Sequence, residues 1–253
     1  MTIDPAMLAL LMAGSFLAAV MQSSTGFGYA VLAVPVYLMM LPARDAVQIN
    51  ILLSFLVMAV MMARLWRGAP WRLIGMVSLG TALGAPAGLY FLTQAPDKVV
   101  KATVGGVLAV LLAYILWRRR TRPILAADRP PPRPALEALT GGFGGALGAG
   151  IGMPGPPLLV YFGLAGGGKD IVRPGTMAFL LVAFGGIALL NMVTVGYSAS
   201  VLTITAWLTP AVLAGCAAGS WLARHIDQRR FDIVTLGALG VTVAAMLWAV
   251  ARG

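Results

Sequence analysis

The chain has 253 residues, of which 60% are hydrophobic and 10% are charged, and its mean hydropathy is +0.90. A soluble domain carries about 25% charged residues, so the composition excludes a soluble protein and predicts an all-α polytopic membrane protein. The net charge of +10 is scattered over the ends of apolar segments, which argues against nucleic-acid binding, and the single cysteine excludes a disulfide framework.

The first apolar segment is interrupted by residues 22–28, which read QSSTGFG. Helix-breaking residues at membrane depth persist only where they are buried or face a polar cavity. The arms on either side, about 7–21 and 29–41, would each rise roughly 20 Å as helices, short of the ~30 Å hydrocarbon core. We therefore expect a re-entrant helical hairpin. Three apolar runs of membrane-spanning length follow it, near 47–63, 73–93 and 99–117.

A basic, proline-rich linker then divides the chain. Residues 118–134 contain six arginines and five prolines, which predicts an irregular cytoplasmic segment. The second half begins with another break, residues 148–157, which read GAGIGMPGPP, and its second arm is shorter still, about 157–165. The predicted domains are a first transmembrane repeat over 1–117, the linker, and a second repeat over 135–253. The apolar runs of the second half lie near 174–195, 201–222 and 232–250.

The two halves resemble one another in sequence. A shift of 127 residues superimposes parts of the two broken segments, and a shift of 131 superimposes glycines of later helices. An ordered series of such matches indicates an internal duplication with a short insertion or deletion. The matched pairs include Gly14 with Gly141, Phe16 with Phe143, Gly28 with Gly155, Gly84 with Gly215, and Gly88 with Gly219.

The basic residues distinguish two topologies. If each half had four simple spans, lysines and arginines would divide ten to eight between the two sides, which gives no orientation. If each broken segment returns to its own side, fourteen lie inside and four outside, as the positive-inside rule requires. Three full spans per half then make the second half inverted, so that the hairpin tips meet from opposite sides near the midplane. A ten-span arrangement of the same parity remains open.

The two breaks have the chemistry of an anion site. The second arm of each hairpin begins as a helix whose first N–H groups lack internal partners and whose dipole favours an anion. Asn50 and Thr176 occupy matching positions just inside the following helices, where an interhelical hydrogen bond is the alternative role. The candidate substrate-binding residues are Gln22, Ser23, Ser24, Thr25, Gly26, Phe27, Gly28, Asn50, Gly152, Met153, Pro154, Gly155, Pro156 and Thr176.

The chain lacks the residue patterns of an enzyme. None of the eight acidic residues falls in the middle of a predicted span, where a cation path or a carboxylate proton relay would normally place one. Neither a metal-ligand set nor a nucleotide-binding loop nor a catalytic triad is recognisable. We therefore expect no enzymatic activity, no metal and no cofactor, and an anionic substrate.

The order of these motifs resembles the sulfite exporter TauE/SafE family of membrane permeases over nearly the whole chain. That family typically has a glycine-rich stretch early in each half, a proline soon after, a polar residue opening the next helix, and a basic loop with tryptophan. The first half departs from the usual glycine run at residues 23–28, so its tip need not recognise the same anion. The matching residues are Gly14 to Gly28, Pro35, Asn50, Arg64 to Arg72, Gly141 to Gly152, Met153 to Pro157, and Thr176.

The resemblance implies transport, usually export, of sulfite, sulfoacetate or another small organosulfur or organic anion across the inner membrane. We therefore predict a multi-pass inner-membrane transporter that alternates access around the hairpin tips, with the bilayer and a small anion as its partners. A passive anion channel and a membrane subunit that anchors a partner enzyme are the alternatives. The sequence leaves open the anion, the direction, the coupling ion and the oligomeric state, a homodimer included.

Overall fold

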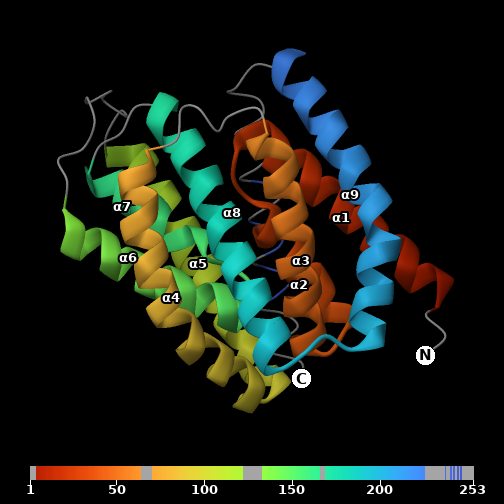
Figure 1. Ribbon diagram of the computed structural model, residues 1–253. Helices are drawn as coiled ribbons and strands as arrows, with labels where there is room; N and C mark the ends of the chain where they lie inside the picture. Colours follow the sequence, from red (N-terminus) through yellow and green to blue (C-terminus); the bar gives the residue numbers. More distant parts are fainter. Residues whose placement is uncertain are drawn as a thin grey trace.

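The computed structural model describes residues 4–63, 70–121, 133–165 and 169–225, with a few single positions between 237 and 246. All regular secondary structure in these ranges is α-helical (Figure 1). The predicted last span, 232–250, lies outside the continuous described ranges. The helices are α1 (Pro5–Thr25), α2 (Tyr29–Met40), α3 (Ala43–Met62), α4 (Trp71–Gln94), α5 (Asp97–Thr121), α6 (Pro134–Ile151), α7 (Gly155–Ala165), α8 (Lys169–Thr194) and α9 (Ala199–His225).

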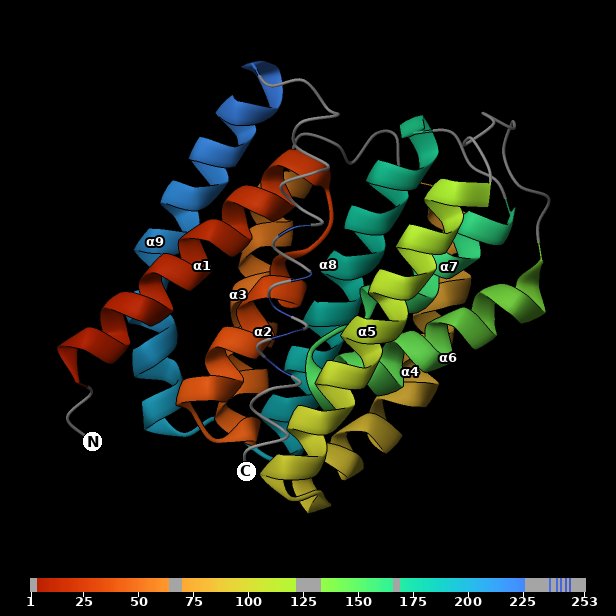
Figure 2. The same cartoon turned by 180° about the vertical axis from the view of Figure 1, so that it is seen from behind.

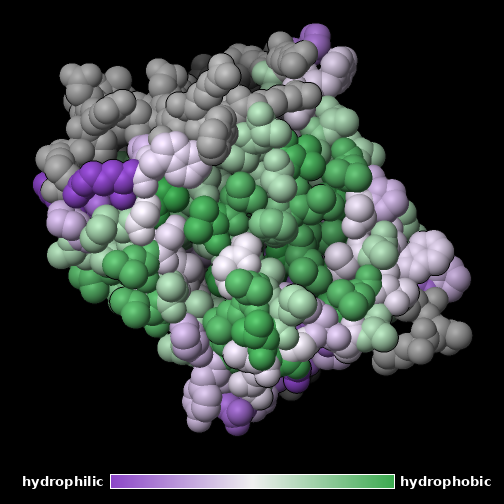
Figure 3. Space-filling view, in the orientation of Figure 1, coloured by the Kyte–Doolittle hydropathy of each residue, from purple (hydrophilic) through white to green (hydrophobic). Residues whose placement is uncertain are grey.

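The helices have the length and surface of membrane-spanning elements. In the described chain, six of them are long and apolar enough to cross a bilayer: α1, α3, α4, α5, α8 and α9. Large apolar side chains such as Leu83, Val110 and Val193 are at least 70% exposed. Figure 3 shows that hydrophobic residues cover the middle of one face, whereas hydrophilic residues gather towards its edges. The all-α polytopic membrane fold is therefore confirmed.

Five of the predicted spans match helices α3, α4, α5, α8 and α9 closely. The expectation of a short first arm is wrong, because α1 continues through Thr25 and its 21 residues rise about 32 Å. The Ser23 hydroxyl donates to the Ala19 carbonyl one turn earlier, so the polar residues of the first break extend the helix. The linker also begins later than predicted, because α5 continues to Thr121.

The main helix contacts keep the same pattern when each helix is replaced by its counterpart from the other half. α4 packs along α6 just as α1 packs along α9, and α3 lies against α8 between these two pairs. The matched glycines make both contacts close: a Cβ atom at Gly84 would overlap the Gly142 carbonyl of α6, and one at Gly215 would overlap the Phe16 carbonyl of α1. Small residues allow such backbone approach in membranes. This exchange pattern supports the predicted duplication.

The helices alternate in direction, so the helix ends that border the basic segments of the sequence lie at one end of the bundle. In Figure 2, α3, α5 and α9 end towards the top of the view, where α4 and α8 begin. α1 starts and α2 ends towards the bottom, whereas α7 ends towards the top. α2 and α7 have only 12 and 11 residues, too few for a membrane span. Each half therefore contains one long and one short arm on either side of its break.

Candidate substrate site at the two helix breaks

The first break is built from two glycines with left-handed backbone. α1 ends at Thr25, and Gly26 follows with φ of 86° and donates its N–H to the Gln22 carbonyl at 2.8 Å. Gly28, with φ of 118°, precedes the first residue of α2. Residues with side chains rarely adopt this conformation. The sharp turn between the two helices therefore depends on Gly26 and Gly28.

The second break uses a different termination. Gly152 has φ of 75° and donates its N–H to the Gly148 carbonyl at 2.9 Å, while the Met153 N–H reaches the Leu147 carbonyl at 3.2 Å. This paired arrangement is a common way to end a helix. α7 then begins at Gly155 and carries two prolines in its first turn, where a missing N–H costs little. Both predicted breaks occur, but each is shorter than predicted: the helices are interrupted only at residues 26–28 of the predicted 22–28 and at residues 152–154 of the predicted 148–157.

The structure brings the two breaks into direct contact. A Cβ atom at Gly155 would lie 2.8 Å from Cε2 of Phe27, so the ring of the first break rests on the glycine of the second. Asn50 of α3 adds a second link, because its Nδ2 donates to the Gly152 carbonyl at 2.9 Å. Breaks that are about 127 residues apart in the chain therefore form one site.

A small cavity lies at this contact. It measures about 20 Å³, which is room for about one water molecule. Half of the fourteen predicted site residues line it, four of them from the second break. The lining residues are Gln22, Phe27, Gly28, Tyr29, Ala30, Val31, Ser54, Met58, Met153, Pro154, Gly155, Pro156, Leu180 and Phe184.

The other predicted residues lie around the cavity without lining it. The Ser24 and Thr25 hydroxyls bond to the carbonyl oxygens of Val20 and Met21 in α1, and Thr25 also closes the turn onto Phe27. These hydroxyls therefore stabilise the end of α1 in this structure. The predicted residues outside the cavity wall are Ser23, Ser24, Thr25, Gly26, Asn50, Gly152 and Thr176.

The polar groups of the cavity come mainly from the first half. Gln22 accepts the Tyr29 N–H at 2.9 Å through Oε1, and its Nε2 lies 3.9 Å from Sδ of Met58. Ala30 and Val31 also line the cavity, and their N–H groups belong to the first turn of α2, where helices leave donors unpaired. In α7, by contrast, Pro156 and its neighbouring proline lack an N–H. The donors available to an anion therefore belong chiefly to α2.

The cavity walls from α3 and α8 escaped the sequence-based prediction. Ser54 and Met58 lie four and eight residues after Asn50, and Leu180 and Phe184 lie four and eight residues after Thr176. Residues at this spacing share one face of a helix. Asn50 and Thr176 thus lie on the same helix faces as the residues that line the cavity, and helical periodicity from these two positions was the signal that could have found the walls.

The walls also occupy positions that match between the two halves of the sequence. The shift of 126 residues that matches Asn50 with Thr176 also matches Ser54 with Leu180 and Met58 with Phe184. Corresponding positions of the two halves therefore face one space, as expected for a ligand site at a repeat interface. The match is chemically uneven, because the Ser54 hydroxyl of the first half corresponds to the apolar Leu180 of the second.

The arrangement suits a small anion held by neutral groups. Within the described residues, those that line the cavity include no charged side chain. The described chain also contains no group of three His, Cys, Asp or Glu side chains placed to hold a metal ion. The Thr176 hydroxyl is buried and has no hydrogen-bond partner among the described residues. It lies one helical turn before Leu180, so a free hydroxyl is available beside the cavity.

No curated protein and no solved structure matches the chain. A family model described as sulfite exporter TauE/SafE matches residues 11–246, which include both breaks, all nine described helices in whole or large part, and every residue of the cavity wall. The earlier resemblance is therefore confirmed over most of the chain, and the fold is that of a multi-pass membrane transporter. The chain is a member of the sulfite exporter TauE/SafE family.

Proposed function

We propose that this protein is a secondary transporter that exports a small anion, such as sulfite, sulfoacetate or another organosulfur or organic anion, across the inner membrane. The observation that carries the proposal is the cavity at which the two breaks meet. The cavity is lined by Ala30 and Val31 of the first turn of α2 and by Gln22, whose Oε1 already accepts the Tyr29 N–H. A helix N-terminus attracts anions through its free donors and its dipole.

The size of the cavity bears on the mechanism. A space for about one water does not admit a four-atom anion such as sulfite, so the ligand binds only when the breaks separate. Phe27 resting on Gly155 is the contact that has to open. In the proposed cycle the two hairpins move apart towards one side and then the other, so the cavity is exposed to each side in turn. A continuously open channel is not favoured by such a closed contact.

The proposal includes two inverted repeats, each with a hairpin and three spans, over 1–117 and 135–253. The fourteen-to-four division of basic residues supports it, as does the exchange pattern of the helix contacts. The hairpins enter from opposite sides in this arrangement, and the linker 118–134 lies in the cytoplasm. The basic loops then face the cytoplasm as positive-inside topology requires.

Counterflow of radiolabelled sulfite into liposomes that contain only the purified protein tests the function. The wild type is expected to accumulate label, and Gly155→Val is expected to lose about tenfold or more of this flux because the added methyl groups collide with Phe27. The φ of Gly155 is not positive, so the effect is steric. Gly186→Val is the matched control, because a Cβ atom there meets nothing within 4 Å.

Two outcomes contradict the proposal. Absence of wild-type flux for sulfite and for a panel of sulfonates and small carboxylates would remove the transport function and favour a role that needs a partner protein. Equal flux in Gly155→Val and Gly186→Val, at equal insertion into the liposomes, would leave transport in place and remove the site from the two breaks.

A further inference from the structure

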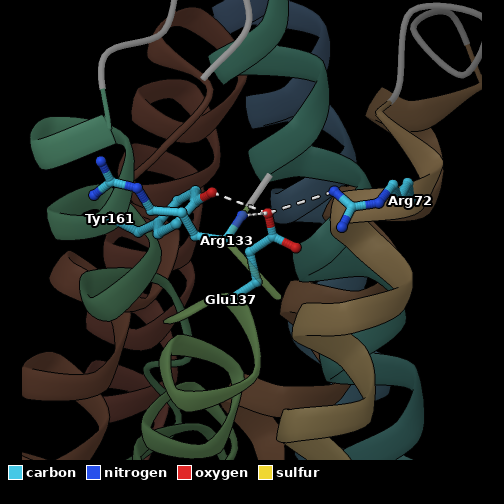
Figure 4. A network of polar contacts seen from close by, with 4 residues as sticks. All are labelled: Arg72, Arg133, Glu137 and Tyr161. Carbon is cyan, nitrogen blue, oxygen red and sulfur yellow. Dashed lines mark hydrogen bonds and ion pairs between the residues drawn. The ribbon is translucent and has the colours of Figure 1, made fainter. Parts of the chain in front are cut away.

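A carboxylate is buried near the start of the second hairpin. Glu137, in the first turn of α6, is 2% exposed. Its Oε1 accepts the Arg133 N–H and the Tyr161 hydroxyl, each at 3.1 Å, and lies 3.8 Å from Nη1 of Arg72 (Figure 4). Burying a carboxylate costs free energy unless the group is fully paired by hydrogen bonds or opposite charges. Only 10% of the residues in this chain are charged.

The pairing of Glu137 is incomplete. Its second oxygen, Oε2, is buried and has no hydrogen-bond partner among the described residues. Arg72 is 59% exposed, and an exposed partner at this separation contributes little. Figure 4 shows the Arg133 side chain extending away from the carboxylate, so Arg133 contributes only its backbone N–H. Within the described residues, one oxygen of this buried carboxylate therefore has no hydrogen-bond partner.

The fold of a hairpin does not require an acid at this place. The shift of 127 residues that matches the two hairpins places Leu10 opposite Glu137, and Leu10 is 56% exposed. The first hairpin thus forms with an apolar residue at the corresponding position. Glu137 supplies something that is particular to the second half.

Glu137 connects the helices that hold the second break. It lies on α6, which ends at Gly152, and it accepts a hydrogen bond from Tyr161 of α7, which begins at Gly155. Through Arg72 it also faces α4, the helix that packs along α6. A change of charge on this carboxyl therefore alters the attraction between α4 and the hairpin whose tip lines the cavity.

We propose that Glu137 is the residue at which the transporter binds and releases a proton in each cycle, and that Oε2 is the atom that carries it. Water on one side supplies the proton and water on the other receives it, so only one O–H bond forms and breaks. The protonated carboxyl keeps its Oε1 contacts with Arg133 and Tyr161 and loses its negative charge, which removes its small attraction to Arg72 of α4. The inference rests on the proposed transport function and adds its coupling ion.

The described charged and titratable groups that face Glu137 are few. They are Arg72 from α4, Arg133 just before α6, and Tyr161 from α7. The side chains of Lys169, Asp170 and Arg173 on α8, and of arginines 118–120 on α5, lie outside the described residues.

Liposomes with the purified protein separate coupling from transport. A pH gradient is expected to drive net movement of radiolabelled sulfite in the wild type. Glu137→Gln, which mimics the protonated carboxyl, is expected to lose this stimulation about tenfold while sulfite–sulfite exchange at equal pH stays within about twofold. Asp97→Asn is the matched control, since Asp97 also accepts a backbone N–H, from Ala43 at 3.1 Å, but is exposed. The titration of sulfite itself is the same in all three samples.

Wild-type flux that ignores the pH gradient would overturn the inference and leave the proposed function intact, whereas absent wild-type flux would remove the function itself. Stimulation retained in Glu137→Gln would also overturn it. If that variant does not fold, labelling of the wild type with dicyclohexylcarbodiimide decides, because this reagent modifies protonated carboxyls in apolar surroundings. We expect labelling of Glu137, and absence of labelling at this residue would contradict the proposal.

Discussion

Phe27 is the side chain through which the first break contacts the second. Its ring rests on Gly155 and lines the cavity. The shift of 127 residues places Pro154 opposite Phe27 and Ala149 opposite Gln22, so the duplicated positions differ in both size and polarity. A ligand in the cavity therefore meets the Gln22 amide and the start of α2 on one side and a mostly apolar surface on the other. Size selection and anion recognition thus rest on different residues.

Replacing Phe27 by alanine is expected to widen the range of anions. The change removes the ring that fills the contact, and a difference of this size in a pocket is worth about tenfold in selectivity. We expect the ratio of sulfoacetate to sulfite flux to rise by about that factor in competition assays with liposomes. Phe143→Ala is the control, because Phe143 of α6 is 66% exposed. A ratio that stays at the wild-type value would show that Phe27 does not limit the site.

At the scale of the helices, the fold depends on glycines at the α4–α6 and α1–α9 contacts. Gly80, Gly84 and Gly88 repeat every four residues along one face of α4, and a Cβ atom at any of them would overlap a backbone atom of α6. Gly215 and Gly219 bring α9 equally close to α1. Because lipid is as apolar as the helix surface, such close packing supplies much of the association between helices in a membrane.

Gly84→Ala is therefore expected to destabilise the protein by about 1–3 kcal/mol, the usual cost of overpacking. The added methyl group meets the rigid backbone at Gly142 rather than a movable side chain. Gly75→Ala on the same helix has open space at its Cβ and is expected to be neutral or slightly stabilising. Thermal unfolding of the two variants in detergent gives the comparison, and equal midpoints would contradict this account of the packing.

Hydropathy was sufficient to predict five of the spans, because runs of about 20 apolar residues have few alternatives in a membrane protein. It was insufficient at α1, where Ser24 and Thr25 resemble a break in sequence but bond to carbonyls of their own helix. Such local hydrogen bonds compete with either structure, so composition alone does not place the end of the helix. The glycines that end it were visible in the sequence.

The glycine-containing breaks of the candidate site could be predicted from the sequence, whereas its apolar wall residues could not. Gly28 and Gly155 belong to glycine-rich clusters that helices rarely contain, and both residues line the cavity. Met58 and Phe184 look like ordinary core residues until the fold places them against the breaks. Glu137 was not expected to be buried, because its burial follows from the packing of α4 and α7 around the start of α6.

In the whole molecule, different polar contacts hold the two ends of the helix bundle. Glu137 and Tyr161 join α6 to α7 towards the end where α7 terminates. Towards the opposite end, Gln48 of α3 donates to Asn191 of α8 at 3.2 Å and to the Gly196 carbonyl at 3.0 Å. Both glutamine and asparagine are fully buried or nearly so. In the proposed transport cycle, opening one of these ends while the other stays joined would expose the cavity to each side in turn.

The inverted arrangement makes a prediction about the two ends of the chain's second half. With three full spans in each half, a reporter fused after Arg252 lies outside, and one inserted within 118–134 lies inside. Paired fusions measure this directly. Alkaline phosphatase is active only outside the inner membrane. Green fluorescent protein fluoresces only in the cytoplasm, because it does not become fluorescent after export through the general secretory route.

We expect the fusion after Arg252 to be active as phosphatase and dark as the fluorescent protein, and the insertion in 118–134 to behave in the opposite way. The physical reason is the division of lysines and arginines, fourteen against four, because basic loops stay in the cytoplasm. The control changes this division of charge. Several lysines added beside Lys98 and Lys101 are expected to weaken the preference for this orientation in the membrane. Both reporters on the same side would give the second half an even number of spans, which would contradict the proposed arrangement of three full spans in each half.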